Sequence, residues 1–328
     1  MGDVAPEDGP ATESPSAQQR STPGPSVPEP VASWFPSVSG VLRGGVPARD
    51  DGAPRARGVE TVTPHPLAPA DIGIFELERV MAGHWQAPDR EHLGGWLLRA
   101  AGGFTGRANS VLTVGDPGMA VPQALAAVRA WYATRGLPPT ASVVGPPGRA
   151  LPDAAAHDPL GPALAADGWH VLAGAGALVL TAGLEPLRTC GPEQPAGGLT
   201  LDLAAAPDAG WLGTYRYRGQ DLPADAVEVL LSAPDQVFCS IRDGAGTAAV
   251  ARGSLGAGWV GVAAVEVTPP YRRRGLARVL LAAIARWGVA AGADRAYLQV
   301  GDANAAALAL YAAAGFAVHH RYDYLRAG

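Results

Sequence analysis

The stretch Val265-Glu-Val-Thr-Pro-Pro-Tyr-Arg-Arg-Arg-Gly-Leu-Ala277 decides the fold, because it reads as the end of a strand, a turn and the start of a helix. The apolar, β-branched run from Trp259 to Val267 has strand length, and two prolines follow it. From Leu276 onward the apolar residues recur at helical spacing and form one stripe, made of Leu276, Val279, Leu280, Ala283, Ile284 and Trp287. We therefore expect a buried strand that leads into a buried helix through a short basic turn.

The basic turn has the chemistry of a phosphate site. A helix N-terminus leaves backbone N–H groups unpaired and carries a partial positive charge, and Gly275 lets a ligand approach the main chain closely. Arg272, Arg273 and Arg274 add bidentate donors, which suit a pyrophosphate better than a single carboxylate. An isolated Arg-Arg-Arg run is more often a solvated turn or a nucleic-acid patch, so its context in the chain decides between these interpretations.

Two motifs supply that context. Arg272-x-x-Gly275-x-Ala277 resembles the (Q/R)-x-x-G-x-(G/A) signature of the GNAT acetyltransferase superfamily. Asn304-Ala-Ala-Ala-Leu-Ala-Leu-Tyr-Ala-Ala-Ala-Gly-Phe316 resembles the N-x-x-A-x-x-L-Y-x-x-x-G-F helix of the same superfamily, and an expected strand from Ala296 to Val300 lies between the motifs. The resemblance covers Leu199 to Arg326 and implies direct transfer of an acetyl group from acetyl-CoA, as cosubstrate, to an amine in a ternary complex.

The resemblance also implies roles for particular residues. The turn and first helical residues would bind the pyrophosphate of CoA, and Asn304 would lie against CoA; the turn residues are Arg272, Arg273, Arg274, Gly275, Leu276 and Ala277. Backbone N–H groups near Val265 and Val267 would polarise the thioester carbonyl and pair with the pantetheine. Tyr311 would donate a proton to the leaving thiolate, because a phenol has a reference pKa near ~10 against ~8.5 for a thiol.

The general base stays open at this stage. Glu266 is the obvious carboxylate, although simple alternation puts it on the opposite strand face from Val265 and Val267. The position at which some superfamily members carry a catalytic Glu corresponds to about Gly261. Two further alternatives for the base are a water chain and the pair His319 and His320. For these two histidines, a surface pair without a catalytic role is the commoner explanation.

Composition excludes several classes of protein. The chain has 328 residues, 48% of them hydrophobic and 17% charged, which describes a globular protein. The net charge of −5 disfavours nucleic acid as a partner. Cys190 and Cys239 lie in no metal-ligand spacing, so we expect no metal site and a reducing cytoplasm. No apolar run is long enough to span a bilayer, and no signal peptide is recognisable. The sequence leaves open whether two copies of the chain form a homodimer.

The chain divides into a tail and two similar units. Residues 1–66 are rich in Pro, Ala and Ser without apolar periodicity, so we expect a disordered tail. We expect a degenerate GNAT-like domain over 67–190 and a catalytic GNAT domain over 196–328, because Leu164 to Trp169 is laid out like Tyr311 to Phe316. In the first unit His157 stands where Asn304 stands in the second. The expected fold class is α/β (α+β), with tandem GNAT-like units, each a mixed, mostly antiparallel sheet flanked by helices.

The first unit still offers candidate substrate-binding residues. Glu91 to Ala100 and Phe104 to Val114 are predicted to form a hairpin around Gly102 and Gly103, and residues 93–110 resemble an actinobacterial two-part GNAT family, some of whose members are assigned as N-acetylglutamate synthases. Alternation would put Arg107 and Asn109 on one strand face, either lining a cleft between the units or satisfying polar groups of the hairpin. Two expected helices of the second unit add Arg216 and Arg218.

The sequence therefore predicts an acetyl-CoA-dependent N-acetyltransferase acting on a small amine. An amino acid such as glutamate is the leading acceptor, since the two units supply enough arginines to bind a dicarboxylate. Two alternatives remain open. One is an acetyltransferase for a protein lysine, a protein N-terminus or a polyamine. The other is a pseudoenzyme that binds CoA or an amino acid without catalysis.

Overall fold

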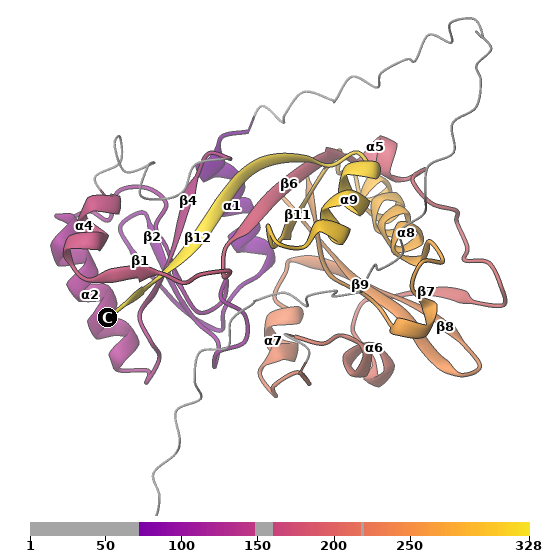
Figure 1. Cartoon of the computed structure of the whole chain (residues 1–328), viewed down its shortest axis with the longest axis horizontal. Coiled ribbons are helices and arrows are strands. Elements are labelled where there is room, and N and C mark those ends of the chain that lie inside the picture. Colours follow the sequence, from indigo (N-terminus) through magenta and orange to yellow (C-terminus); the bar gives the residue numbers. More distant parts are fainter. Residues whose placement is uncertain (1–71, 148–159, 218–219) are drawn as a thin grey trace, which may run out of the picture. The chain divides into compact units, whose positions relative to one another are not determined.

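The computed structural model of the protein describes residues 72–147, 160–217 and 220–328 (Figure 1). The expected disordered tail over 1–66, the candidate Arg218 and the His157 counterpart of Asn304 lie outside these residues. The first part of the described chain has these elements: α1 (Ile74–His84), β1 (Asp89–Leu93), β2 (Trp96–Ala100), β3 (Val111–Leu112), α2 (Val121–Ala133), β4 (Thr140–Gly145), α4 (Leu160–Ala166), β5 (Trp169–Val171), β6 (Ala177–Gly183) and α5 (Leu184–Leu187).

The second part repeats a similar order of elements. They are β7 (Thr200–Ala204), α6 (Ala209–Thr214), α7 (Ala226–Leu230), β8 (Asp235–Asp243), β9 (Gly246–Gly256), β10 (Trp259–Val267), the short 3-10 helix η1 (Pro269–Tyr271), α8 (Leu276–Ala290), β11 (Arg295–Val300), α9 (Ala305–Ala313) and β12 (Ala317–Ala327). The strand, turn and helix expected from Trp259 to Trp287 are confirmed, and the predicted stripe of α8 is buried from Leu276 to Ile284.

All of these strands join one sheet. Its order is β1-β2-β3-β4-β12-β6-β11-β10-β9-β8-β7, and β5 pairs with β12 beside this path. Among the strands of the described residues, only β3 with β4 and β10 with β11 run parallel, and the other pairs are antiparallel. The prediction of a mixed, mostly antiparallel sheet flanked by helices is therefore confirmed.

The last strand of each half lies in the sheet of the other half. Strand β6, from the first half, pairs with β11 on one side and with the start of β12 on the other. The end of β12, from the second half, pairs with β4 and with β5. Figure 1 shows β12 running alongside β6 and on to β4. Each half thus completes its hydrogen-bond ladder with a strand from the other half.

Two bulges interrupt the central strands. The register of β10 against β9 shifts between Ala263 and Glu266, and Ala264 has a positive φ of 54°. The register of β12 against β6 shifts between Val318 and His320. A bulge bends its strand and re-aims the side chains around it. Both bulges matter for the site described below.

The prediction of a strand from Phe104 to Val114 is wrong, because only Val111–Leu112 is strand. The predicted strand from Glu91 to Ala100 is split into β1 and β2 by a turn at Gly94 and Gly95, with Gly94 at φ 57°. Strand β2 still pairs antiparallel with β3, through Leu97 and Leu112, across the loop that contains Gly102 and Gly103. Residues 101–110 form a loop, because the Asn109 side chain binds its backbone groups. The alternation argument that put Arg107 and Asn109 on one strand face therefore fails. The predicted strand from Trp169 to Thr181 is likewise split into β5 and β6, with Gly174 at φ 67° between them.

Candidate active site

The parallel strands β10 and β11 separate along their length. They pair from Trp259 opposite Arg295 to Val262 opposite Leu298, and no pairing continues beyond that point. The bulge that follows Ala263 turns β10 away from β11 while its pairing with β9 resumes at Glu266. From Ala263 onward the edge of β10 that faces β11 therefore has no partner strand within the described chain, so its backbone groups there are available to a ligand.

This opening fits the main-chain role expected of Val265 and Val267. Val265 lines the cavity described below, and Val267 pairs with Ala249 of β9. Extended backbone without a partner strand is the arrangement that an extended amide chain such as a pantetheine can pair with.

The turn between η1 and α8 has the backbone of an anion site. Arg273 and Gly275 have left-handed conformations, with φ of 63° and 77°, and Gly275 is the N-cap of α8. Helix geometry leaves the first N–H groups of α8, including those of Leu276 and Ala277, without an acceptor inside the helix. A Cβ added at Gly275 would meet nothing within 4 Å, so the space above the turn is open. These residues fit a pyrophosphate.

The three arginines of the turn differ in their contacts. The Nε of Arg272 donates to the Val267 carbonyl at 3.1 Å, and its Nη2 lies 3.7 Å from Glu266 Oε1. Arg274 lies over the ring of Tyr271, 5.3 Å from its centroid, and Arg273 is exposed. Arg272 therefore also holds the end of β10, while Arg273 and Arg274 project from the turn.

Helix α9 presents the two residues of the second motif. Asn304 is its N-cap, and Asn304 Oδ1 accepts a hydrogen bond from the Ala307 N–H at 3.1 Å. Tyr311 is buried against Phe316, and burial raises the pKa of the Tyr311 phenol to about 12. The phenol is therefore protonated throughout the neutral range, as a proton donor must be.

Glu266 is half buried beside this helix. Burial raises the pKa of its carboxyl group, and the nearby Arg272 opposes that shift. Both Glu266 and Val265 line the cavity, because the bulge breaks the simple alternation expected along β10. Glu266 therefore lines the same cavity as Arg107 and Tyr311.

The other candidates for the base lie elsewhere. A Cβ added at Gly261 would fall 2.4 Å from the Tyr297 hydroxyl and 2.7 Å from Ser254 Oγ, so these two side chains occupy the space where some superfamily members carry a carboxylate. His320 is fully buried and bonded to Glu78 of α1, and neither His319 nor His320 lines the cavity.

One cavity collects residues from both halves of the chain. It has a volume of about 190 Å³ and includes Arg107 from the loop after β2. The second half contributes residues of the opening and of α9, among them Glu266, Asn304 and Tyr311, together with Tyr215, Arg216 and Tyr217 after α6. Gln299 of β11 and Tyr322 and Tyr324 of β12 complete this part of the wall. Sequence reasoning missed these three residues, although the alternation of Tyr322 and Tyr324 was a signal that they share a face.

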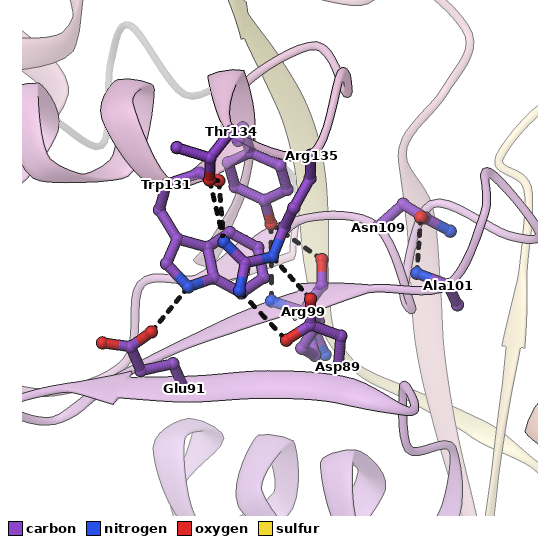
Figure 2. A network of polar contacts seen from close by, with 9 residues as sticks. Asp89, Glu91, Arg99, Ala101, Asn109, Trp131, Thr134 and Arg135 are labelled. Carbon is purple, nitrogen blue, oxygen red and sulfur yellow. Dashed lines mark hydrogen bonds and ion pairs between the residues drawn. The ribbon is translucent and has the colours of Figure 1, made fainter.

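The four residues that are candidates for binding the acceptor substrate have different surroundings. Arg107 lies over the ring of Trp85, 4.4 Å from its centroid, and has no carboxylate partner among the described residues. Arg216 is exposed and forms an ion pair with Asp221. Asn109 accepts from the N–H groups of Ala101 (Figure 2) and Gly103 and donates to two carbonyls of its loop. Asn109 therefore holds the loop that carries Arg107, and Arg218 is not described.

Two buried arginines lie near Arg107. Arg99 donates to the carbonyl and hydroxyl of Ser110 at 2.9 and 3.1 Å. Arg252 donates to the carbonyls of Leu230 and His84 and to Gln236 Oε1. Burial lowers the pKa of both guanidinium groups, to about 10 for Arg252, and the charge of Arg107 contributes in the same direction. The hydrogen-bond partners of Arg99 and Arg252 are neutral. Positive charge therefore accumulates behind the part of the cavity wall that Arg107 forms, which we call the Arg107 wall.

The described residues also bear on metal binding and membrane insertion. They contain no group of three or more His, Cys, Asp or Glu side chains that could hold a metal ion. None of the described helices is both long and apolar enough to cross a membrane.

Comparison with known proteins places this geometry in a family. The model of the family described as "Probable histone acetyltransferase Rv0428c C-terminal" matches residues 72–325. A Mycobacterium tuberculosis protein named "Probable histone acetyltransferase Rv0428c" is 31% identical over 255 residues, which are 77% of this chain and 74% of that protein.

Solved structures agree in fold. A GCN5-related N-acetyltransferase from Kribbella flavida has a TM-score of 0.55 at 21% identity, covering 78% of this chain and 96% of its own. A tandem GNAT protein from the clavulanic acid biosynthesis pathway has a TM-score of 0.54 at 16% identity, covering 77% and 88%. The chain therefore belongs to the Rv0428c C-terminal family and is an N-acetyltransferase of the GNAT superfamily, whose members use acetyl-CoA.

Proposed function

We propose that the protein transfers the acetyl group of acetyl-CoA to the amino group of a small molecule that carries a carboxylate, with glutamate as the leading candidate. The observation that carries this proposal is Arg107. Its guanidinium group comes from the first half, lines the same cavity as Glu266 and Tyr311, and has no carboxylate partner among the described residues.

In this proposal the acyl donor lies in the opening between β10 and β11. The pyrophosphate would bind at the turn from Arg272 to Ala277, and backbone N–H groups near Val265 and Val267 would polarise the thioester carbonyl. Acetyl-CoA supplies the activated acetyl group. Asn304, at the start of α9, would contact CoA from the facing side of the opening.

Glu266 and Tyr311 then have complementary proton-transfer roles. Glu266, directly or through a water molecule, would accept a proton from the acceptor ammonium, so that a neutral amine attacks the carbonyl carbon. As the C–S bond breaks, the Tyr311 hydroxyl would donate its proton to the departing sulfur. The nitrogen now bonded to the acetyl carbon would lose its second proton to solvent, from which the Tyr311 phenolate would be reprotonated. Because burial raises the pKa of Glu266, this base would lose its charge at a higher pH than an exposed glutamate does.

The charge of the cavity supports an anionic acceptor. Its charged side chains are Arg107, Arg216 and Glu266, and Arg99 and Arg252 lie behind the Arg107 wall. Buried cations without a carboxylate partner, such as Arg99 and Arg252, are costly, and a nearby negative charge offsets part of that cost. A carboxylate at Arg107 would pair with a guanidinium that is already ordered by stacking on Trp85.

The alternatives predict a different cavity. The Mycobacterium tuberculosis relative is named a probable histone acetyltransferase, and a lysine side chain or a polyamine favours carboxylates around the acceptor. Glu266 is the single carboxylate among the described residues that line the cavity. A pseudoenzyme would not require Glu266 and Tyr311 in the same cavity, and their joint presence favours catalysis.

A panel of acceptors tests the proposal directly. Thiol release from acetyl-CoA would be measured with glutamate, other amino acids, spermidine and a lysine peptide. We expect the carboxylated amines to give the highest kcat/KM. A preference for spermidine or the peptide would overturn the choice of acceptor, and no turnover with any amine would favour the pseudoenzyme.

Substitutions of Arg107 test the carboxylate contact. We expect Arg107→Ala to raise the acceptor KM about 10- to 100-fold, which corresponds to the loss of a hydrogen bond to a charged group, while acetyl-CoA binding stays unchanged. Arg107→Lys should recover part of the affinity. Arg188→Ala, which removes an exposed arginine paired with Glu185, is the matched control. Loss of the fold in Arg107→Ala, seen by circular dichroism, would instead assign Arg107 a structural role.

A further inference from the structure

Helix α1 and strand β12 are joined by a line of hydrogen bonds. His320 Nε2 lies 2.9 Å from Glu78 Oε1, His320 Nδ1 lies 2.8 Å from His319 Nδ1, and His319 Nε2 lies 3.0 Å from the Ile72 carbonyl oxygen. The β12 bulge between Val318 and His320 brings two consecutive histidine rings together. We call Glu78, His319 and His320 the His-Glu cluster.

The number of protons in this cluster follows from its contacts. Three hydrogen bonds need three protons. The Ile72 carbonyl supplies none, a carboxylate supplies none, and each neutral imidazole supplies one. Two neutral histidines and an ionised Glu78 are therefore one proton short, whichever tautomers are chosen. All three bonds form only when the cluster binds one further proton, on an imidazole or on Glu78.

Burial makes this proton count energetically important. The side chain of His320 is 0% exposed and that of Glu78 is 7% exposed, so water does not replace a missing hydrogen bond there. Burial lowers the pKa of His319, with the Ile72 contact acting against that shift. With one extra proton bound, all three hydrogen bonds of the cluster are complete. In that state the cluster has no net charge.

The cluster adjoins the Arg107 wall of the cavity. Glu78 borders a small inner cavity of about 10 Å³ together with Arg99, Arg107 and Tyr322, and Arg107 and Tyr322 also line the active-site cavity. The groups that face Glu78 come from several elements: Arg99 from β2, Arg107 from the following loop, Tyr297 from β11, and His319, His320 and Tyr322 from β12. The charge of the cluster therefore acts on the proposed carboxylate site.

We propose that the His-Glu cluster stores one proton and thereby sets the affinity of the Arg107 site for the acceptor carboxylate. This inference rests on the proposed function. With the proton bound, Glu78 is neutralised within the cluster, and the charges of Arg99, Arg107 and Arg252 are left for the acceptor. When the proton is lost, a net negative charge behind Arg107 competes with the acceptor carboxylate.

The sign of the pH dependence follows from this competition. Acceptor affinity is highest while the proton is bound and falls as rising pH removes it. By linkage, acceptor binding favours proton uptake by the cluster. One charge acting over several ångströms at protein-like dielectric changes the acceptor KM roughly tenfold. Acetyl-CoA binding, at the far side of the cavity, should not share this dependence.

Glu78→Gln separates the proton from the hydrogen bonds. The glutamine amide donates its own N–H to His320 Nε2, so both histidines complete the line while neutral and no extra proton is needed. We expect the acceptor KM of this variant to match the low-pH value of the wild type and to stay flat as pH rises. Glu76→Gln removes the same charge from the exposed face of α1, and its KM should follow the wild-type pH profile.

The experiment measures the acceptor KM from pH 6 to 9, a range chosen to span histidine titration, in the full chain with glutamate as the probe. A wild-type KM that does not change with pH, or a Glu78→Gln KM that rises as in the wild type, would overturn the inference. Nitrogen-15 NMR of the imidazoles tests the proton count without any acceptor: two neutral rings at neutral pH in a wild type whose Glu78 is ionised would contradict it. A chain that acetylates no carboxylated amine would refute the proposed function and the link to the acceptor, and the NMR spectra would still decide whether the proton is stored.

Discussion

Tyr311 belongs both to the hydrophobic core and to the active-site cavity. It packs in the main core next to Phe316, and it also lines the active-site cavity. Burial raises the pKa of its phenol to about 12, so the hydroxyl stays protonated in the neutral range, as the proposed donor to the leaving thiolate must. The motif from Asn304 to Phe316 selected this tyrosine from the sequence, and the structure places it in the active-site cavity.

Tyr311→Phe tests this role. We expect kcat to fall roughly 100-fold or more, as for the loss of a general acid, while the acetyl-CoA dissociation constant stays within about twofold, because the hydroxyl acts mainly in the transition state. Stopped-flow thiol release and calorimetric titration with acetyl-CoA measure the two quantities. Unchanged turnover would remove Tyr311 from the mechanism.

At the scale of elements, α9 and the loop before β3 show how side chains shape the site. Asn304 caps α9 and lines the cavity at the same time. Asn109 holds the loop 101–110 by four hydrogen bonds, and Trp85 Nε1 donates to the Thr105 hydroxyl of that loop at 2.9 Å. Local sequence predicted the helix but not the loop, because the partners that order the loop include a residue of α1's C-cap.

Variants of Asn304 separate capping from cofactor binding. Asn304→Ala removes the cap and should lower the free energy of unfolding by about 1 kcal/mol, measured by urea denaturation. Asn304→Ser keeps a side-chain acceptor and should remain near wild-type stability. If the amide also contacts CoA, both variants should bind acetyl-CoA more weakly. Wild-type affinity in Asn304→Ser would mean that Asn304 acts only as a cap.

At the scale of the whole molecule, the exchange of β6 and β12 ties the halves together. A fragment that starts at Ala196 would lack β6, and both β11 and the start of β12 would lose their partner in the middle of the sheet. The first half without β12 would likewise leave β4 and β5 unpaired on that side. Functional tests therefore require the full chain.

We expect the described halves to unfold in one cooperative transition. Hydrogen exchange measured at increasing urea should show that the most protected amides of β4 and β9, one from each half, share the same opening free energy. The core of each half would open only when β12 leaves the sheet. If the amides of β4 open at a lower free energy while those of β9 stay protected, this expectation is contradicted.

The sequence by itself determined the second half in most of its detail. The strand Trp259–Val267, the helix from Leu276 and the helix that carries Tyr311 were predicted, because each depends on local periodicity, turn chemistry or a motif of residues close in sequence. The basic turn and the tyrosine of α9 followed from motifs whose residues are close in sequence.

Only the tertiary structure decided how the cavity is assembled. Arg107 and Tyr322 come from distant parts of the chain and line the same cavity as Glu266 and Tyr311, and Trp85 lies under the Arg107 guanidinium. The bulges at Ala264 and His319 depend on pairing with neighbouring strands, which no local pattern encodes. The His-Glu cluster has the same origin, because its hydrogen bonds join residues more than 240 positions apart.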